Sequence, residues 1–381
     1  MVWPRAAVLV LCCASVSPAN LPSAAKAVGG GSWRPGEVGC RDEHGKAVDW
    51  WFIYKLPDGF VYAYWDAASN GAREKLVPVN DRFLNCTTQC ALGSTLHQLY
   101  LNKTGLASVL YNDEPPEPYG ADAASDAGVR DGYQTAHAKG VLAFDGTGAA
   151  FWLIHSVPKF PDLTLPSFTW TASTTYGQSF LCLSLDAQTV DVAAFQLRHV
   201  NAQIFSANAP KWLPEMGPNM SLLINRTQAR ETNASIQTIT TRAGVAVDHF
   251  AKSAVWGRDL YEDFVEDHYQ QGFMWETWRR MPYTEPTYCS KDGNHRFDSV
   301  NVMSIAFGNA SRYDQSFKYT RDHCKWGISQ TGPIVCVGDI NRMTSQKKRG
   351  GGTACMRNLP LWSALHGIIN STETCVIRPG T

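Results

Sequence analysis

Short apolar runs separated by turn residues recur along the chain and predict buried β-strands. Trp50–Leu56 (WWFIYKL) is a dense run of β-prone residues that ends at the turn signal Pro57-Asp58-Gly59. Leu106–Tyr111 and Ile334–Val337 are further apolar runs of strand length. We therefore expect several buried strands that are distributed along most of the chain.

Two further patterns predict a hairpin and a helix. Gly140–Phe144 and Ala149–Ile154 flank the turn-forming residues 145–148 (DGTG), so we expect the two runs to pair as a β-hairpin. Apolar residues recur near helical spacing over Asp248–Glu266, which predicts a helix there. Strands interleaved with helices indicate a layered α/β protein.

The N-terminus has the features of a secretory signal peptide. Arg5 supplies a positive charge, Ala6–Val16 is apolar, and Ser17-Pro18-Ala19 offers small residues for cleavage. We assign residues 1–19 to the signal and residues 20–39 to a poorly ordered segment. No later apolar run is long enough to span a bilayer. We expect a soluble protein of the secretory pathway, lysosomal or secreted, with no membrane partner.

Cysteines and sequons agree with that compartment. Nine cysteines remain after signal cleavage, which suits disulfides in an oxidising compartment with one thiol left over. Cys86 and Cys90 are four positions apart, but no second pair follows at a spacing typical of zinc sites, so a metal site is not expected. Seven sequons are candidate glycosylation sites: Asn85, Asn102, Asn219, Asn225, Asn233, Asn309 and Asn370.

The overall charge leaves the class of ligand open. The chain has 34 Lys and Arg against 34 Asp and Glu, so no basic excess indicates a nucleic-acid partner. Ten histidines would become charged in an acidic compartment and make the protein cationic there. Hydrophobic residues make up 44% of the chain, which is enough to build a sizeable core.

One short motif occurs twice. His137-Ala138-Lys139 is an H-x-K sequence that recurs 186 residues later as His323-Cys324-Lys325, and the same offset carries His155 onto Asn341. In each copy an apolar run lies between the motif and that last polar residue. The shared offset predicts two related halves, which we place at residues 40–235 and 236–381.

The paired motif contains the groups that phosphoryl transfer requires. Residues two apart on a strand point to the same face, so each His and Lys can enter one site together. One imidazole can attack phosphorus while the other protonates the leaving oxygen. The two lysines can stabilise the developing charge, so neither a metal nor another cofactor is expected.

Other readings of these residues stay open. A lone H-x-K arises often by chance, His155 by itself suits a satisfied core histidine, and Asn341 by itself suits a cap or turn. The remaining histidines show no such pattern, and we expect them to be structural or on the surface: His44, His97, His199, His249, His268, His295 and His366.

Longer words around these motifs resemble the deoxyribonuclease II family, whose H-x-K pairs are those of the phospholipase D superfamily. The resemblance runs from about Cys40 to Cys375 and is weakest between residues 185 and 235. The words that carry it are VDWWFIYKLP from Val48, LYNDEPPEP from Leu110, HAKGVLAFD from His137, FWLIHSVPKFP from Phe151, TYGQSFLC from Thr175, DHCKW from Asp322, CVGDINR from Cys336 and GGGTACMRNLPLW from Gly350.

The resemblance implies a fold and an activity. It implies a phospholipase D-like pseudo-dimer in which each half is a β-sheet flanked by helices and the active site lies between the halves. It implies an acid endonuclease that cuts double-stranded DNA without metal, leaves 3′-phosphate and 5′-hydroxyl ends, and degrades the DNA of dead or engulfed cells. We expect no obligatory protein partner, and we expect the protein to be a monomer or a homodimer.

The resemblance also assigns individual residues. The active histidines match His137, His155 and His323, and the lysines match Lys139 and Lys325; the repeat adds Asn341. The implied disulfides are Cys40–Cys182, Cys289–Cys375 and Cys336–Cys355, to which proximity alone adds Cys86–Cys90. Two positions depart from the family pattern: Cys324 replaces a small polar residue, and Gly327 stands where cysteine is frequent.

A mechanistic hypothesis follows. His137 attacks the phosphodiester, and protonated His323 donates to the departing 5′-oxygen before it activates water. The near equivalence of the two motifs leaves open which histidine is the nucleophile. Three alternatives also remain: a lipid-directed phospholipase D, a catalytically inactive DNA-binding homologue, and a secreted nuclease that acts on extracellular DNA or as a toxin.

Overall fold

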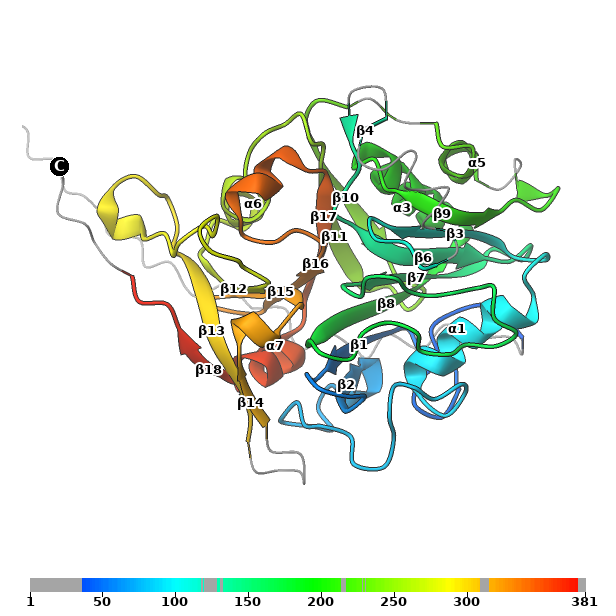
Figure 1. The fold of residues 1–381 in the computed structure, drawn as a ribbon, viewed down its shortest axis with the longest axis horizontal. Coiled ribbons are helices and arrows are strands. Elements are labelled where there is room, and N and C mark those ends of the chain that lie inside the picture. Colours follow the sequence, from blue (N-terminus) through cyan, green and yellow to red (C-terminus); the bar gives the residue numbers. More distant parts are fainter. Residues whose placement is uncertain are drawn as a thin grey trace, which may run out of the picture. The chain divides into compact units, whose positions relative to one another are not determined.

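The computed structural model describes most of the chain between Gly36 and Cys375 (Figure 1). The expected signal peptide and residues 20–35 lie outside the described part. Val38 is buried, and its backbone N–H donates to Asp145 Oδ2 at 3.2 Å, so residues just before Cys40 contact the first sheet. The described residues are 36–117, 119, 129–130, 133–213, 217–227, 229, 231–308 and 315–375.

The first part of the chain forms a seven-stranded sheet in which all neighbouring strands are antiparallel. The strands predicted near residues 50 and 106 are β1 and β3, and the predicted hairpin is β6 with β7. In spatial order the strands are β2 (Tyr62–Asp66), β1 (Trp50–Lys55), β8 (Gln178–Asp186), β7 (Ala149–His155), β6 (Lys139–Phe144), β3 (Ala107–Asn112) and β9 (Ile204–Asn208).

The second part forms a nine-stranded mixed sheet, in which β12 and β13 are parallel. The apolar run near residue 334 is its strand β16, as predicted. The main path is β10 (Ala234–Thr240), β11 (Ala246–Lys252), β17 (Gly351–Arg357), β16 (Ile334–Gly338), β15 (Lys325–Ser329), β12 (Phe273–Thr277), β13 (Ser299–Phe307) and β14 (Gln315–Lys318), with β18 (Ile369–Thr372) paired to β13. Two short strands, β4 (Val129–Arg130) and β5 (Tyr133–Gln134), pair separately.

Helices are few, so the described chain is a mixed α/β structure dominated by its sheets. Two of them begin at side-chain caps, where Asp186 and Asn358 accept the N–H groups of Thr189 and Leu361. The helices are α1 (Ala91–Leu101), α3 (Ala187–His199), α5 (Pro218–Ile224), α6 (Asp267–Tyr269) and α7 (Leu359–His366). Shorter turns are η1 (Ala67–Ser69), the π-helix η2 (Tyr261–Glu266), η3 (Ser290–Asp292), η4 (Tyr319–Arg321) and η5 (Thr344–Lys348).

The central strands of each sheet are buried on both faces. In β1, Trp50, Phe52 and Tyr54 enter a central core cluster that also contains Trp326 and Val337 of the second sheet. The alternate residues of β1 face a separate cluster with the apolar side of α1, and the outer face of the second sheet packs against η2. This double burial explains why the strands are continuously apolar instead of alternating.

The helix predicted over Asp248–Glu266 is wrong for most of its length. Residues up to Lys252 belong to β11, which pairs with both β10 and β17, and only the end of the range is helical, in η2. Phe250 and Phe264 lie in different elements, yet their ring centroids are 5.0 Å apart. The apparent helical spacing therefore comes from two elements that face the same core.

A similar unit occurs once in each sheet. Strands β3-β6-β7-β8 are adjacent, antiparallel and followed by α3, whereas β12-β15-β16-β17 are adjacent, antiparallel and followed by α7. Lys139 is the first residue of β6, and Lys325 is the first residue of β15. The units differ in the strand pair that extends one edge. In the β1–β2 pair the earlier strand, β1, lies beside β8, whereas in the β10–β11 pair the later strand, β11, lies beside β17.

Four disulfides join described cysteines, and none of them links the two sheets to each other. Cys40–Cys182 and Cys86–Cys90 lie in the first part of the chain, and Cys289–Cys375 and Cys336–Cys355 lie in the second. Cys324 is free and buried. These are the four pairs named above.

The described part of the chain has no helix that is long and apolar enough to cross a membrane. Asn219 is half-buried, and its amide is used internally: Nδ2 donates to Asp191 (2.9 Å) and Oδ1 accepts from Arg198 (2.8 Å). Asn309 lies outside the described residues. The other five sequon asparagines are exposed: Asn85, Asn102, Asn225, Asn233 and Asn370.

Candidate active site

The two H-x-K motifs occupy equivalent places at the starts of β6 and β15. Each lysine is the first residue of its strand, and each histidine lies two residues before that lysine. Asn112 at the end of β3 pairs with Lys139, and Thr277 at the end of β12 pairs with Lys325. The motif therefore lies where the chain enters the sheet.

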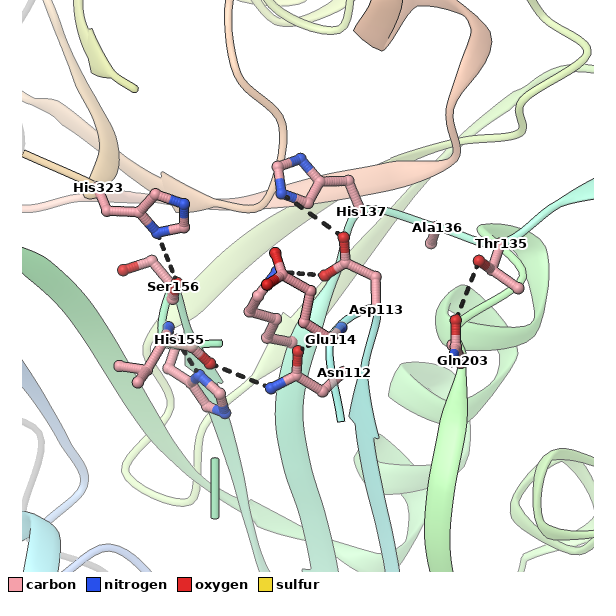
Figure 2. Close-up of polar contacts among 12 residues, drawn as sticks. Asn112, Asp113, Glu114, Thr135, Ala136, His137, His155, Ser156, Gln203 and His323 are labelled. Atoms are coloured by element: carbon pink, nitrogen blue, oxygen red, sulfur yellow. Dashed lines mark hydrogen bonds and ion pairs between the residues drawn. The ribbon is translucent and has the colours of Figure 1, made fainter. Parts of the chain in front are cut away.

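Backbone hydrogen bonds fasten each motif to the other part of the chain. The N–H of His137 donates to Gly350 O (2.8 Å), directly before β17, and the N–H of His323 donates to Gly177 O (2.9 Å), directly before β8. Gly177 also forms an isolated bridge with Asp322. These reciprocal bonds bring the two motifs together, and Figure 2 shows both imidazole rings on the same side of the strands.

Hydrogen bonds also orient the two imidazole rings. His323 Nδ1 lies 2.9 Å from the backbone oxygen of Ser156. A carbonyl oxygen can only accept, so Nδ1 carries a proton and Nε2 remains for chemistry. His137 Nδ1 lies 2.7 Å from Gln346 Oε1, which favours the same tautomer.

Asp113 is a site residue that the sequence did not identify. It directly follows β3 and ion-pairs with Lys139, and its Oδ2 lies 3.2 Å from Arg349 and 3.8 Å from His137 Nε2 (Figure 2). Burial opposes its ionisation, but Lys139, His137 and Arg349 hold the pKa of this carboxyl well below its usual range. In the sequence, Asp113 is indistinguishable from a turn residue before Pro115-Pro116.

Burial lowers the pKa of both H-x-K histidines well below the ordinary value. Lys139 and Lys325 act in the same direction on both rings, and His137 also lowers the pKa of His323. Asp113 raises the pKa of His137 and partly offsets these effects. Both rings are therefore predominantly neutral until the solution becomes acidic.

A second lysine and a buried carboxyl complete the charged centre. Burial and the neighbouring Lys139 lower the pKa of Lys325 to about 7, and its Nζ donates to His323 O at 2.9 Å. Burial raises the pKa of Asp339 to about 7, although Gly352 N–H donates to Oδ2 (3.2 Å). Below that pH the lysine is cationic and the carboxyl is neutral, so the centre becomes more positive in acid.

His155 and Asn341 are buried, but they differ from the H-x-K residues in their contacts. The His155 ring packs against Phe160 and Phe180, and its Nδ1 accepts the N–H of Val157 (3.2 Å). Figure 2 shows this ring pointing away from those of His137 and His323. Asn341 lies beyond β16, and its Oδ1 has no hydrogen-bond partner among the described residues.

The described residues include no group of three or more His, Cys, Asp or Glu side chains arranged to hold a metal ion. The cations at the centre are the side chains of Lys139, Lys325 and Arg349. Their arrangement suits the binding of an anion between two imidazole rings.

Comparison with known proteins identifies the family. The family profile described as deoxyribonuclease II matches residues 39–375. Deoxyribonuclease-2-alpha of Mus musculus is 31% identical over 358 residues, which cover 90% of this chain and 96% of that protein. Plancitoxin-1 of Acanthaster planci is 30% identical over 356 residues (89% and 92%). A putative deoxyribonuclease-2 of Burkholderia thailandensis is 33% identical over 348 residues (86% and 91%).

The match covers both sheets and both H-x-K motifs. The family profile spans the candidate site and the sheets that carry it, and the relatives align along most of their own length. Both motifs therefore lie within the region of similarity. The chain belongs to the deoxyribonuclease II family and is a hydrolase of the deoxyribonuclease type.

Proposed function

We propose that this protein is an acid endonuclease that hydrolyses double-stranded DNA without metal and leaves 3′-phosphate and 5′-hydroxyl ends. The observation that carries the proposal is the reciprocal bonding of His137 to Gly350 and of His323 to Gly177, which holds two His/Lys pairs at one centre. We further propose that residues 40–235 and 236–381 are the two halves of a phospholipase D-like pseudo-dimer.

In the first step, His137 Nε2 attacks the scissile phosphorus. The N–P bond forms as the P–O5′ bond breaks, and the electron pair of that bond goes to O5′, which takes a proton from His323 Nε2. The imidazole of His137 becomes positive as it is phosphorylated. Asp113 Oδ2 lies 3.8 Å from this nitrogen in the resting site and stabilises that charge.

In the second step, water hydrolyses the phosphohistidine. His323, which is now neutral, accepts a proton from the attacking water, and the N–P bond breaks to regenerate neutral His137. The 3′-phosphate leaves, and both imidazoles return to their starting states. The same His323 thus acts first as acid and then as base.

Lysines and a buried amide stabilise the phosphorane oxygens. Lys139 and Lys325 provide cations in a water-poor centre, where a fixed charge acts strongly on a developing anion. The buried Asn341 amide serves as a further donor to the phosphate. These groups take the electrostatic role that a divalent ion has in other nucleases.

His155 acts as a positioning residue for His323 in this proposal. Its Nδ1 accepts the N–H of Val157, which fixes the short segment that contains Ser156. The backbone oxygen of Ser156 in turn accepts the Nδ1 proton of His323. His155 therefore influences the chemistry through the orientation of His323.

Acid activity follows from the pKa directions. The first step needs protonated His323, whose pKa lies below the ordinary histidine value. The rate therefore falls as the pH rises through a value below about 6.5. The test is plasmid nicking in EDTA from about pH 4 to pH 8; undiminished cleavage at about pH 8 would contradict the proposal.

Covalent trapping tests the order of the two histidines. A p-nitrophenyl phosphodiester needs little help from an acid, so His323→Ala should still be phosphorylated but should lose its base for hydrolysis. We expect phosphate on the peptide that contains His137. If His137→Ala and His323→Ala both cleaved DNA at the wild-type rate at about pH 5, the scheme would be wrong. A phosphatidylcholine assay run in parallel tests the lipid-directed alternative.

The cellular setting is part of the proposal. Disulfides in both parts of the chain and five exposed sequons support a glycoprotein of the secretory pathway, lysosomal or secreted. In that setting the substrate is DNA released from dead or engulfed cells. Because both His/Lys pairs come from one chain, a monomer is sufficient for activity.

A further inference from the structure

An aromatic group lies directly beside His323. The Trp278 ring centroid is 4.4 Å from that of His323 in an edge-to-face arrangement, and the guanidinium of Arg280 lies 3.9 Å from the Trp278 centroid. Tyr176 lies 5.7 Å from Trp278 and 6.5 Å from His323. Tyr176 precedes β8 and Trp278 follows β12, so both parts of the chain contribute.

The apolar core does not account for these rings. Neither Trp278 nor Tyr176 belongs to the three core clusters of the described residues. Both side chains are half-buried, and Arg280 is exposed. The guanidinium lies over the indole ring, and Arg280 as a whole residue is exposed.

The repeated unit allows the position of Trp278 to be compared with its equivalent in the first sheet. Trp278 directly follows β12, as Asp113 directly follows β3, and the preceding residues pair with Lys325 and Lys139. The first half places a carboxylate there, which binds its lysine. The second half places an indole there instead, so the surface beside His323 is aromatic where the surface beside His137 is ionic.

The segment after Trp278 extends this surface toward His137. Met281 and Tyr283 are 75% and 62% exposed. The backbone oxygen of Tyr283 accepts the N–H of Thr344 (3.0 Å), at the start of η5. Gln346 of η5 bonds the His137 ring. The segment thus connects the indole beside His323 with η5, whose Gln346 contacts His137.

We propose that the Trp278–Arg280 stack binds one unstacked nucleobase of the DNA strand that is cut, the base on the leaving 5′-oxygen side of the scissile phosphate. Planar guanidinium groups and indoles stack on nucleobases, and such stacking is tolerant of sequence. The base is assigned to the leaving-oxygen side because Trp278 lies beside His323, which protonates the 5′-oxygen in the proposed mechanism. The inference rests on the proposed function and specifies where the leaving nucleoside binds.

The test uses a ratio of substrates and so does not depend on overall activity. Short oligonucleotides with a single hydrolysable linkage carry either a base or an abasic sugar on the leaving side. For the wild-type enzyme we expect kcat/KM to favour the base at least about tenfold, given the usual size of base stacking on aromatic side chains. Arg280→Lys keeps a positive charge beside the indole but removes the planar group, so it should reduce this ratio to near one.

Arg258→Ala is the matched control, because Arg258 is an exposed arginine over another indole, Trp256, at 5.3 Å. This variant should keep the wild-type ratio. A wild-type ratio of one, or a full ratio in Arg280→Lys, would overturn the inference while DNA cleavage continued. Failure of the wild-type enzyme to cleave either oligonucleotide would instead refute the proposed function.

Discussion

At the scale of single residues, Asp113 connects three groups of the centre. Its carboxylate contacts Lys139, Arg349 and Nε2 of His137, the nucleophile of the proposed mechanism. The lysine would otherwise be a buried cation without a counter-charge, and the ring would lose the anion that stabilises its positive form. In the proposed mechanism, Asp113 therefore links the binding of phosphate to the reactivity of the histidine.

Asp113→Asn should keep the fold and lose most of the activity. The amide retains the shape but removes the charge, so we expect kcat to fall by about 10²-fold, the scale of a lost charge at a catalytic proton-transfer group. Plasmid nicking with circular dichroism as a folding check measures this. Glu114→Gln, an exposed neighbour, is the control and should remain active; equal activity of the two variants would exclude this role.

The sequence located the His/Lys pairs but not all of their surroundings. The repeated H-x-K spacing indicated His137, Lys139, His323 and Lys325, because a duplicated motif is visible in one dimension. Asp113 was not predicted, since a carboxylate after a strand also suits an ordinary turn. Its partners come from distant positions that only folding brings together.

At the scale of elements, the β12–β15 pair is set by one indole. The ring of Trp275 in β12 stacks on Phe273 (ring centroids 4.9 Å apart) and packs against the tilted ring of Tyr261 (4.1 Å), and these contacts hold it over Gly327 of β15. A Cβ at Gly327 would collide with that ring. This explains why the position is occupied by glycine in this chain. By contrast, the strand β11 was not predicted. Its apolar residues and those of the π-helix η2 face the same core, so together they imitate the spacing of one helix.

Gly327→Ala should destabilise the protein by about 1–3 kcal/mol through overpacking. Urea denaturation measures the free energy of unfolding. The loss should shrink when Trp275→Leu is introduced in the same chain, because the collision partner is then smaller. Gly308→Ala, at an exposed position with open space around it, should cost little; a comparable loss there would argue against the steric explanation.

At the scale of the whole molecule, the buried carboxyl of Glu266 makes the folded state more stable in acid than at neutral pH. Burial raises the pKa of Glu266 to about 8, although Trp275 Nε1 donates to it at 2.8 Å. Its folded pKa lies above the unfolded value, so the folded state binds the proton more tightly. The stability from this group is complete below the unfolded pKa and declines as the pH rises toward 8.

Glu266→Gln should flatten this dependence of stability on pH. Between about pH 5.5 and pH 7.5, we expect the wild-type protein to lose about 2–3 kcal/mol more stability than the variant does. Thermal unfolding at several pH values measures the difference in slope. Exposed Glu74→Gln should follow the wild-type slope, and parallel slopes for all three proteins would show that Glu266 does not titrate in this range.

The reciprocal bonds between His137 and Gly350 and between His323 and Gly177 have a consequence for how the enzyme could be divided. Each motif is hydrogen-bonded to the opposite part of the chain. Each of the four disulfides between described cysteines, in contrast, joins two residues of the same part. Two separately produced fragments, split between β9 and β10, would therefore each lack an ordered site. When the two fragments are mixed, DNA cleavage would show that they have reassembled.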